Sequence, residues 1–161
     1  KDLSYNELLI IAAILKSITH KYKVPLIINT NIQVAKSLNA DGLHLGSQNL
    51  KDKNINFKGI LGISVHSLKE AVLAEKLGAD YLLASHIYET DCKKDLKPKG
   101  IKLIEDIKTN VKIPVIALGG INEKNVPEVI SAGADGIAVM SYIMASNAPY
   151  SSAKRLKDML K

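Results

Sequence analysis

The sequence predicts an α/β protein, namely a (β/α)8 or TIM barrel that lacks its first strand–helix–strand segment in this chain. Amphipathic helices alternate with short apolar strands throughout, which favours parallel strands joined by right-handed crossovers. A short link of small residues and aspartate joins a helix end to a strand three times, at 39–42, 78–81 and 133–136. Six strands are predicted where a closed barrel needs eight. Because the first element is a helix, we expect the missing segment to be N-terminal.

Capping residues and prolines mark the helix boundaries. Ser4 and Glu7 have the spacing of a capping box and open a helix that runs to Tyr22. Ser67 and Glu70 repeat this spacing at the start of a second helix. Further helices are predicted at 31–38, at 101–109, after a cap at Asn122 or Asn125, and at 149–161.

Short apolar runs between these helices predict the strands, at 26–28, 42–45, 59–64, 81–85, 115–118 and 136–139. The run Val115–Leu118 has no polar side chain, which predicts a strand buried on both faces. The strands near Leu26 and Ile137 would have open edges if the barrel is incomplete. A doubly wound sheet is the alternative, but the glycine-rich fingerprint of dinucleotide binding is missing from the sequence.

Length and composition are those of one globular domain, which we assign to residues 1–161. No apolar stretch is long enough to cross a membrane, and no signal peptide is visible, so we expect a cytoplasmic protein without a membrane partner. Cys92 is the single cysteine, which excludes an internal disulfide. The net charge of +6 comes from scattered lysines. Because stacking aromatic residues are scarce, we expect anionic small molecules and no nucleic acid as ligands.

The stretch from Ile113 to Ser141 carries the strongest ligand-binding signal. Gly119 and Gly120 follow a predicted strand, and glycine lets backbone N–H groups approach a ligand closely. Ser141 follows the next strand. Adjacent strand ends of this kind form an anion-binding cup, most often for phosphate. A tight turn at the glycines and a helix cap at Ser141 are the alternative, and spacing alone does not choose between them.

Other polar residues follow predicted strands, where barrel enzymes place their sites. His86 begins the longest loop and could transfer protons, although a loop histidine bonded to the backbone is the alternative. Lys93 and Lys94 could cover an anionic substrate, or belong to a flexible basic loop. No paired aspartates or Cys/His cluster indicate a metal, so none is predicted. The remaining strand-end candidates for substrate binding are Asn29, Ser64 and Thr90.

Five motifs together resemble the thiamine phosphate synthase superfamily over essentially the whole chain. They lie at 25–29, 40–46, 62–67, 117–121 and 134–139. The beginning, Lys1 to Ser4, resembles the end of that family's second strand and the helix after it. The resemblance therefore implies a barrel whose first two strands are missing from this chain.

Two enzymes of this superfamily have different residues at the site. The synthase joins a pyrimidine pyrophosphate to a thiazole phosphate, needs magnesium, and carries aspartates where this chain has Thr30 and Asn49. It also carries a proline at the position of His86. The segment from His86 to Lys94 is similar to the thiazole tautomerase branch, in which that histidine is the acid/base. The resemblance therefore favours the tautomerase.

The implied reaction is the aromatisation of a carboxythiazole phosphate by proton transfer in thiamine biosynthesis, without a cofactor. His86 would be catalytic, while Asn29, Ser64, Thr90, Lys93, Gly119, Gly120 and Ser141 would bind the substrate and its phosphate. The expected partner is a small-molecule thiazole phosphate, with a homo-oligomer left open. Two alternatives remain at this point: the magnesium-dependent synthase, and a non-catalytic sensor or regulator that binds thiazole phosphate.

Overall fold

The computed structural model describes residues 3–52, 55–93 and 96–160. It contains one sheet of six parallel strands in the order β1-β2-β3-β4-β5-β6. The strands are β1 (Ile27–Asn29), β2 (Gly42–Leu45), β3 (Ile60–Val65), β4 (Tyr81–Ser85), β5 (Val115–Leu118) and β6 (Gly136–Ala138). The strand order equals the chain order, which is the topology that strand–helix alternation predicts.

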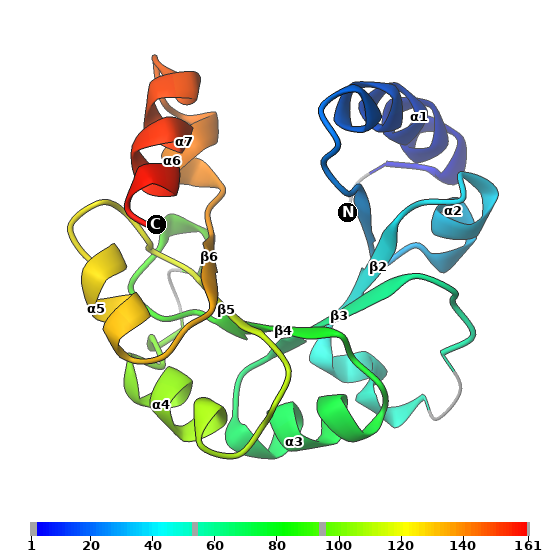
Figure 1. The fold of residues 1–161 in the computed structure, drawn as a ribbon. Helices are drawn as coiled ribbons and strands as arrows, with labels where there is room; N and C mark the ends of the chain where they lie inside the picture. Colours follow the sequence, from blue (N-terminus) through cyan, green and yellow to red (C-terminus); the bar gives the residue numbers. More distant parts are fainter. Residues whose placement is uncertain (1–2, 53–54, 94–95, 161) are drawn as a thin grey trace.

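Helices connect the strands along the convex side of the curved sheet (Figure 1). Two 3₁₀ segments, η1 (Ser47–Lys51) and η2 (Asp91–Lys93), lie in the loops after β2 and β4. The α-helices are α1 (Tyr5–Lys21), α2 (Ile32–Ser37), α3 (Leu68–Lys76), α4 (Lys102–Lys108), α5 (Val126–Ser131), α6 (Ser141–Met144) and α7 (Pro149–Asp158). Both predicted capping serines are confirmed, because the Ser4 and Ser67 side chains accept hydrogen bonds from the backbones of Glu7 and Glu70.

The described strands form a half-barrel, and the predicted eight-stranded barrel is not shown. In the described residues β1 pairs with β2 and β6 pairs with β5, so each end strand keeps one open edge, as expected. The two ends of the curved sheet, with α1 at one and α6 and α7 at the other, stand apart in Figure 1. The predictions about Lys1, Asp2 and Lys161 lie outside the described residues.

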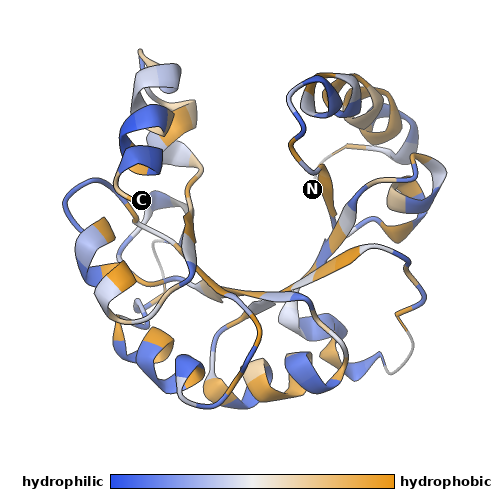
Figure 2. Cartoon of the chain, viewed as in Figure 1, coloured by the Kyte–Doolittle hydropathy of each residue, from blue (hydrophilic) through white to orange (hydrophobic). Residues whose placement is uncertain are grey.

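The core lies between the sheet and the helices. Alternate strand residues such as Leu43, Ile63, Leu82 and Val115 are fully buried, and apolar residues run along the strands in Figure 2. The expectation that 115–118 is buried on both faces is wrong, because Ile116 and Leu118 are only half-buried. Their face of the sheet is the concave one, which six strands do not enclose.

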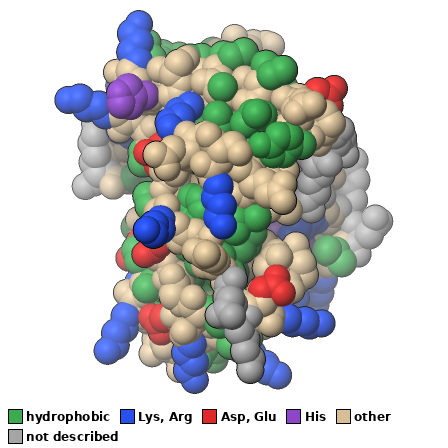
Figure 3. Space-filling model, turned by 90° about the vertical axis from the view of Figure 1, so that its right-hand side faces the viewer, with side chains coloured by type: hydrophobic (Ala, Val, Ile, Leu, Met, Phe, Trp, Pro, Cys, Tyr) green, Lys and Arg blue, Asp and Glu red, His purple; other side chains and the backbone are tan. Residues whose placement is uncertain are grey.

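Helix α1 leaves part of its apolar surface in solvent. Ile10, Ile14 and Ile18 are 62%, 57% and 48% exposed, and hydrophobic side chains gather on the upper part of the face in Figure 3. Within the described residues, no helix combines the length and the apolar character that a membrane crossing requires.

Candidate functional site

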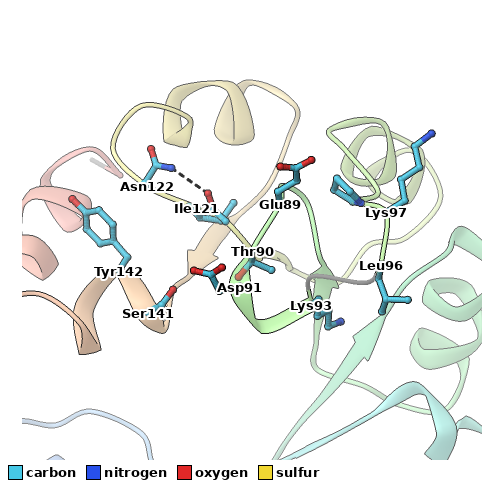
Figure 4. A pocket seen from close by; sticks show the side chains of 12 residues that line it. Glu89, Thr90, Asp91, Lys93, Leu96, Lys97, Ile121, Asn122, Ser141 and Tyr142 are labelled. Atoms are coloured by element: carbon cyan, nitrogen blue, oxygen red, sulfur yellow. Dashed lines mark hydrogen bonds between the residues drawn. The ribbon is translucent and has the colours of Figure 1, made fainter.

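The carboxyl ends of β4, β5 and β6 surround two neighbouring cavities. The larger has a volume of about 820 Å³, which is within the range of small-molecule sites. The loop after β4 supplies one wall, and the loops after β5 and β6 supply the opposite wall (Figure 4). The polar and charged side chains that line this cavity are Glu89, Thr90, Asp91, Lys93, Lys97, Asn122, Ser141 and Tyr142.

The predicted anion cup is brought together in this structure. Gly120 and Ser141 line the larger cavity, and Gly119 and Ser141 line the smaller one, whose volume is about 130 Å³. Lys93, from the loop after β4, lines both cavities and brings a positive charge to them. A phosphate-sized anion would therefore meet backbone, hydroxyl and ammonium donors within one cavity.

The glycine turn needs glycine at both positions. Gly119 and Gly120 have φ angles of +102° and +65°, which L-residues with a side chain rarely adopt. A Cβ atom at Gly119 would collide with His86, and one at Gly120 would collide with the carbonyl oxygen of Glu89. The turn therefore packs directly against the loop that follows β4.

Two asparagines hold the glycine turn from behind. The Nδ2 atoms of Asn122 and Asn125 lie 3.2 and 2.9 Å from the carbonyl oxygen of Gly120 and donate to it. The predicted cap position is confirmed, because Asn125 is the N-cap residue of α5, although its side chain makes no hydrogen bond to the first turn of the helix. Its Oδ1 instead accepts from the backbone nitrogen of Asn122 at 2.8 Å. The side-chain amides of Asn122 and Asn125 therefore stabilise the glycine turn and not the first turn of α5.

His86 is a wall of the smaller cavity and is only 3% exposed. Its Nε2 lies 3.1 Å from the carbonyl oxygen of Leu96. Because a carbonyl oxygen only accepts, Nε2 carries a hydrogen and donates it to the loop. The backbone carbonyl of His86 also accepts from Lys99 at 2.9 Å. Both bonds attach His86 to the later part of its own loop, at Leu96 and Lys99. This is the alternative that the sequence left open, a loop histidine bonded to the backbone.

Asn29 and Ser64 lie away from this pair of cavities. Asn29 is exposed at the end of β1 and lines a separate cavity beside α1. The Ser64 hydroxyl lies 2.8 Å from Nε2 of His44, whose Nδ1 lies 2.9 Å from the Tyr81 hydroxyl. Partial burial lowers the pKa of His44 and favours its neutral form. The predicted set therefore divides between the two sides of the half-barrel.

Thr90 borders both cavities, whereas Lys94 lies outside the described residues. The third strand-end histidine, His66, has its Nδ1 at 2.6 Å from the carbonyl oxygen of Ser85. His66 lies at the entry to α3, where its backbone N–H donates to Glu70 at 2.7 Å. His66 and His86, which follow β3 and β4, are therefore both hydrogen-bonded to backbone carbonyl oxygens.

Sequence reasoning missed Tyr142 and the two residues that hold it. Tyr142 lines both cavities, and its hydroxyl donates to the carboxylate of Glu123. The same carboxylate accepts from Nε of Arg155 at 2.6 Å. Tyr142 and Arg155 are 19 and 32 residues away from Glu123 in the chain, so no local sequence pattern predicts these contacts. The position of Tyr142 directly after Ser141 was the one available signal.

A second tyrosine–carboxylate pair lies behind the glycine turn. The Tyr88 hydroxyl donates to Glu128 of α5 at 2.7 Å. Burial and the neighbouring carboxylate both raise the pKa of Tyr88, so this hydroxyl stays protonated as a donor. The backbone nitrogen of Tyr88 also donates to the carbonyl of Gly119 at 3.0 Å. The pair therefore fixes the loop after β4 against the loop after β5.

Metal ligands are scarce in the described part of the chain. No group of three or more His, Cys, Asp and Glu side chains in it is arranged to hold a metal ion. Thr30 and Asn49 line another cavity, of about 560 Å³, together with Asp52. The Oδ1 atom of Asn49 is buried there without a hydrogen-bond partner. The side chains of Thr30 and Asn49 offer uncharged oxygen atoms as possible metal ligands.

Fold and cavities together define an α/β half-barrel protein with a small-molecule pocket at the carboxyl ends of its strands. Residues 1–143 match the family model described as thiamine monophosphate synthase, and the chain belongs to that family. It is 42% identical to the thiamine-phosphate synthase of Clostridium acetobutylicum over 91% of this chain and 72% of that protein. The synthase of Pyrococcus abyssi is 37% identical over 99% of this chain and 79% of its own length.

Solved structures agree with this assignment. The thiamine phosphate pyrophosphorylase from Pyrococcus furiosus aligns with a TM-score of 0.90 and 36% identity, over 99% of this chain and 79% of that one. A 3-hexulose-6-phosphate synthase aligns with a TM-score of 0.67 at 15% identity, over 93% of this chain and 81% of that one, which shows a shared fold alone. The chain therefore has the fold of its family over nearly its whole length.

The expectation of a thiazole tautomerase is wrong. The similar curated proteins, from 37% to 42% identical, carry the name thiamine-phosphate synthase. The choice of the tautomerase branch rested on the segment from His86 to Lys94 and on Thr30 and Asn49, which stand in place of the synthase's aspartates. A buried imidazole that donates to its own loop is also poorly placed to carry protons between two atoms of a ring.

Proposed function

We propose that this chain is a transferase that joins a pyrimidine pyrophosphate to a thiazole phosphate, forming thiamine phosphate. The observation that carries the proposal is its identity of 37–42% with proteins named thiamine-phosphate synthase, over 89–99% of the chain. The large cavity adds support because its glycine turn and lysines suit a phosphorylated substrate.

The chemistry needs two anionic substrates close together. A ring nitrogen of the thiazole forms a bond to the methylene carbon of the pyrimidine, and the carbon–oxygen bond to pyrophosphate breaks. The pyrophosphate leaves with the electron pair of that bond. In our proposal Gly119, Gly120 and Ser141 hold the thiazole phosphate, and Lys93 offsets negative charge nearby. Thr90 and His86 form the wall against which the ring lies.

Asn29 and Ser64, on the other side of the half-barrel, face the same rim and are proposed to contact the pyrimidine substrate. Asn29 ends β1 and Ser64 lies near the end of β3, and parallel strands place their carboxyl ends on one shared rim. The two halves of the site would then bind the two substrates separately.

Magnesium, which the synthase resemblance implies, does not fit the described residues well. Magnesium sites use one or two carboxylates together with substrate phosphates. Thr30 and Asn49 stand where the resemblance expects aspartates, and both offer only neutral oxygens. The one carboxylate of this cavity, Asp52, shares it with the ammonium group of Lys51, whose positive charge opposes a bound cation. We therefore derive no step through a protein-held metal.

A coupled product assay tests the function. Purified protein would be incubated with the pyrimidine pyrophosphate and the thiazole phosphate, with and without magnesium. We expect thiamine phosphate, measured after oxidation to fluorescent thiochrome, together with an equal amount of pyrophosphate. Saturable binding of thiazole phosphate without product under either condition would contradict the proposal and favour a sensor or regulator.

A further inference from the structure

Glu123 joins three separate elements at the edge of the larger cavity. It follows Asn122, which lines that cavity, in the loop between β5 and α5. Its Oε1 accepts a hydrogen bond from the Tyr142 hydroxyl of α6 and another from Nε of Arg155 in α7, at 2.6 Å. One carboxylate therefore ties the loop that carries the glycine turn to both C-terminal helices.

Apart from Glu123, Tyr142 is held by partial burial against the hydrophobic core and by elements that are themselves weakly buried. Helix α6 is four residues long and has no buried residue. Helix α7 buries only Ser152 and Leu156, and the Ser152 hydroxyl lies 2.9 Å from that of Ser146. The strand before α6, β6, is an edge strand with half-buried residues. The hydrogen bonds to Glu123 are therefore a principal contact that can hold Tyr142 at the cavity.

We propose that Glu123 is a positioning residue, which holds Tyr142 as a wall of the phosphate-binding cavity and so strengthens binding of the phosphorylated thiazole. This inference rests on the proposed function and deepens it, because it names the residue that holds one wall of the proposed thiazole-phosphate site in place. Glu123 does not touch the substrate. It acts through Tyr142, which lines both cavities.

The sign of the change in anion affinity distinguishes a positioning role of Glu123 from an effect of its charge alone. A carboxylate near an anion site opposes anion binding, and Arg155 offsets that charge in the intact protein. Replacing Glu123 by glutamine removes one negative charge. Charge alone would then tighten anion binding, whereas loss of positioning would weaken it. The two explanations predict opposite signs for the same variant.

Binding of inorganic phosphate and of thiazole phosphate, measured by calorimetry, tests the proposal. We expect Glu123→Gln to weaken binding of thiazole phosphate about tenfold, the amount that loss of a charge-assisted contact commonly costs. Tyr142→Phe should have the same effect, and the double variant should be no weaker than either single one. Glu123→Asp should restore part of the affinity. Asp158→Asn, which removes the same charge from α7 outside the cavity, is the matched control and should bind like the unchanged protein.

A spectroscopic measurement separates positioning from general loosening. The hydrogen bond to Glu123 raises the pKa of Tyr142, so its phenol should ionise at lower pH in Glu123→Gln, seen by ultraviolet absorbance against Tyr142→Phe. Thermal unfolding of each variant confirms that it is folded. Equal or tighter binding by folded Glu123→Gln would overturn the proposal, as would failure of the unchanged protein to bind either probe. Binding without thiamine phosphate formation would contradict only the proposed function.

Discussion

The Oδ2 atom of Asp135 lies 2.7 Å from the backbone nitrogen of Val115, so a side chain before β6 accepts the hydrogen bond of the first residue of β5. Two other aspartates repeat this arrangement: Asp41 accepts from Leu26 at 2.8 Å, and Asp80 accepts from Leu61 at 2.7 Å. All three come from the repeated link between helix and strand. The aspartates of the repeat therefore share one role, which is to pair backbone N–H groups at the amino ends of the sheet.

Replacing Asp135 by alanine should destabilise the fold. The change removes the acceptor for Val115 and also the ion pair with Lys108, whose Nζ lies 2.8 Å away. We expect the free energy of unfolding to fall by about 1–3 kcal/mol, the usual cost of leaving such a donor without its partner. Urea unfolding followed by circular dichroism measures it. Asp158→Ala removes an exposed pair and should change stability by less than about 0.5 kcal/mol.

The contribution of Asp135 should depend on pH. Burial alone would raise its pKa, but the Lys108 ammonium and the Val115 N–H together hold the pKa below its ordinary value. A lowered folded-state pKa stabilises the protein above the unfolded value of about 3.9. That stabilisation is lost as the pH falls through the folded value. The stability difference between the unchanged protein and Asp135→Asn should therefore shrink between about pH 5 and pH 2, and a constant difference would contradict it.

Gly120→Ala should weaken phosphate binding at the anion cup, in addition to the loss of stability that backbone strain causes. Gly120 and Gly78 both have positive φ, +65° and +85°, but only at Gly120 would a new Cβ collide with backbone. Each substitution costs about 1–2 kcal/mol for the left-handed conformation. We expect Gly120→Ala also to weaken phosphate binding by about tenfold or more, whereas Gly78→Ala, the matched control, leaves it unchanged. Calorimetric titration with inorganic phosphate measures the difference.

His86→Asn distinguishes an anchoring histidine from an acid/base. Anchoring predicts a loss of thiamine phosphate formation of less than about a hundredfold, the lower range of general acid–base contributions. It also predicts faster proteolysis of the loop 88–99, because the bond from Nε2 to Leu96 is removed. The pH profile of product formation should keep its shape. A loss of about a thousandfold or more with a changed profile would assign His86 to proton transfer instead.

Local patterns predicted much of the fold. The capping box at Ser4, the capping serine at Ser67, the six strands and the aspartate links were all visible in the sequence, because each depends on residues close together in the chain. The lining of the larger cavity was predictable where it follows strand ends, as at Gly120 and Ser141. The role of His86 was not, because its partners, Leu96 and Lys99, lie at the far end of an irregular loop.

The amino-acid sequence by itself determined the alternation of helix and strand, the parallel sheet and the left-handed glycines, since these follow from periodicity and local backbone preferences. Only the tertiary structure decided which face of the sheet is covered and which side chains share a cavity. Six strands leave the concave face half-buried, and Glu123 meets Tyr142 and Arg155 through folding alone. The reason is geometric. The curvature of the sheet and the packing of the helices bring together residues that are far apart in the chain, and no short stretch of sequence predicts such contacts.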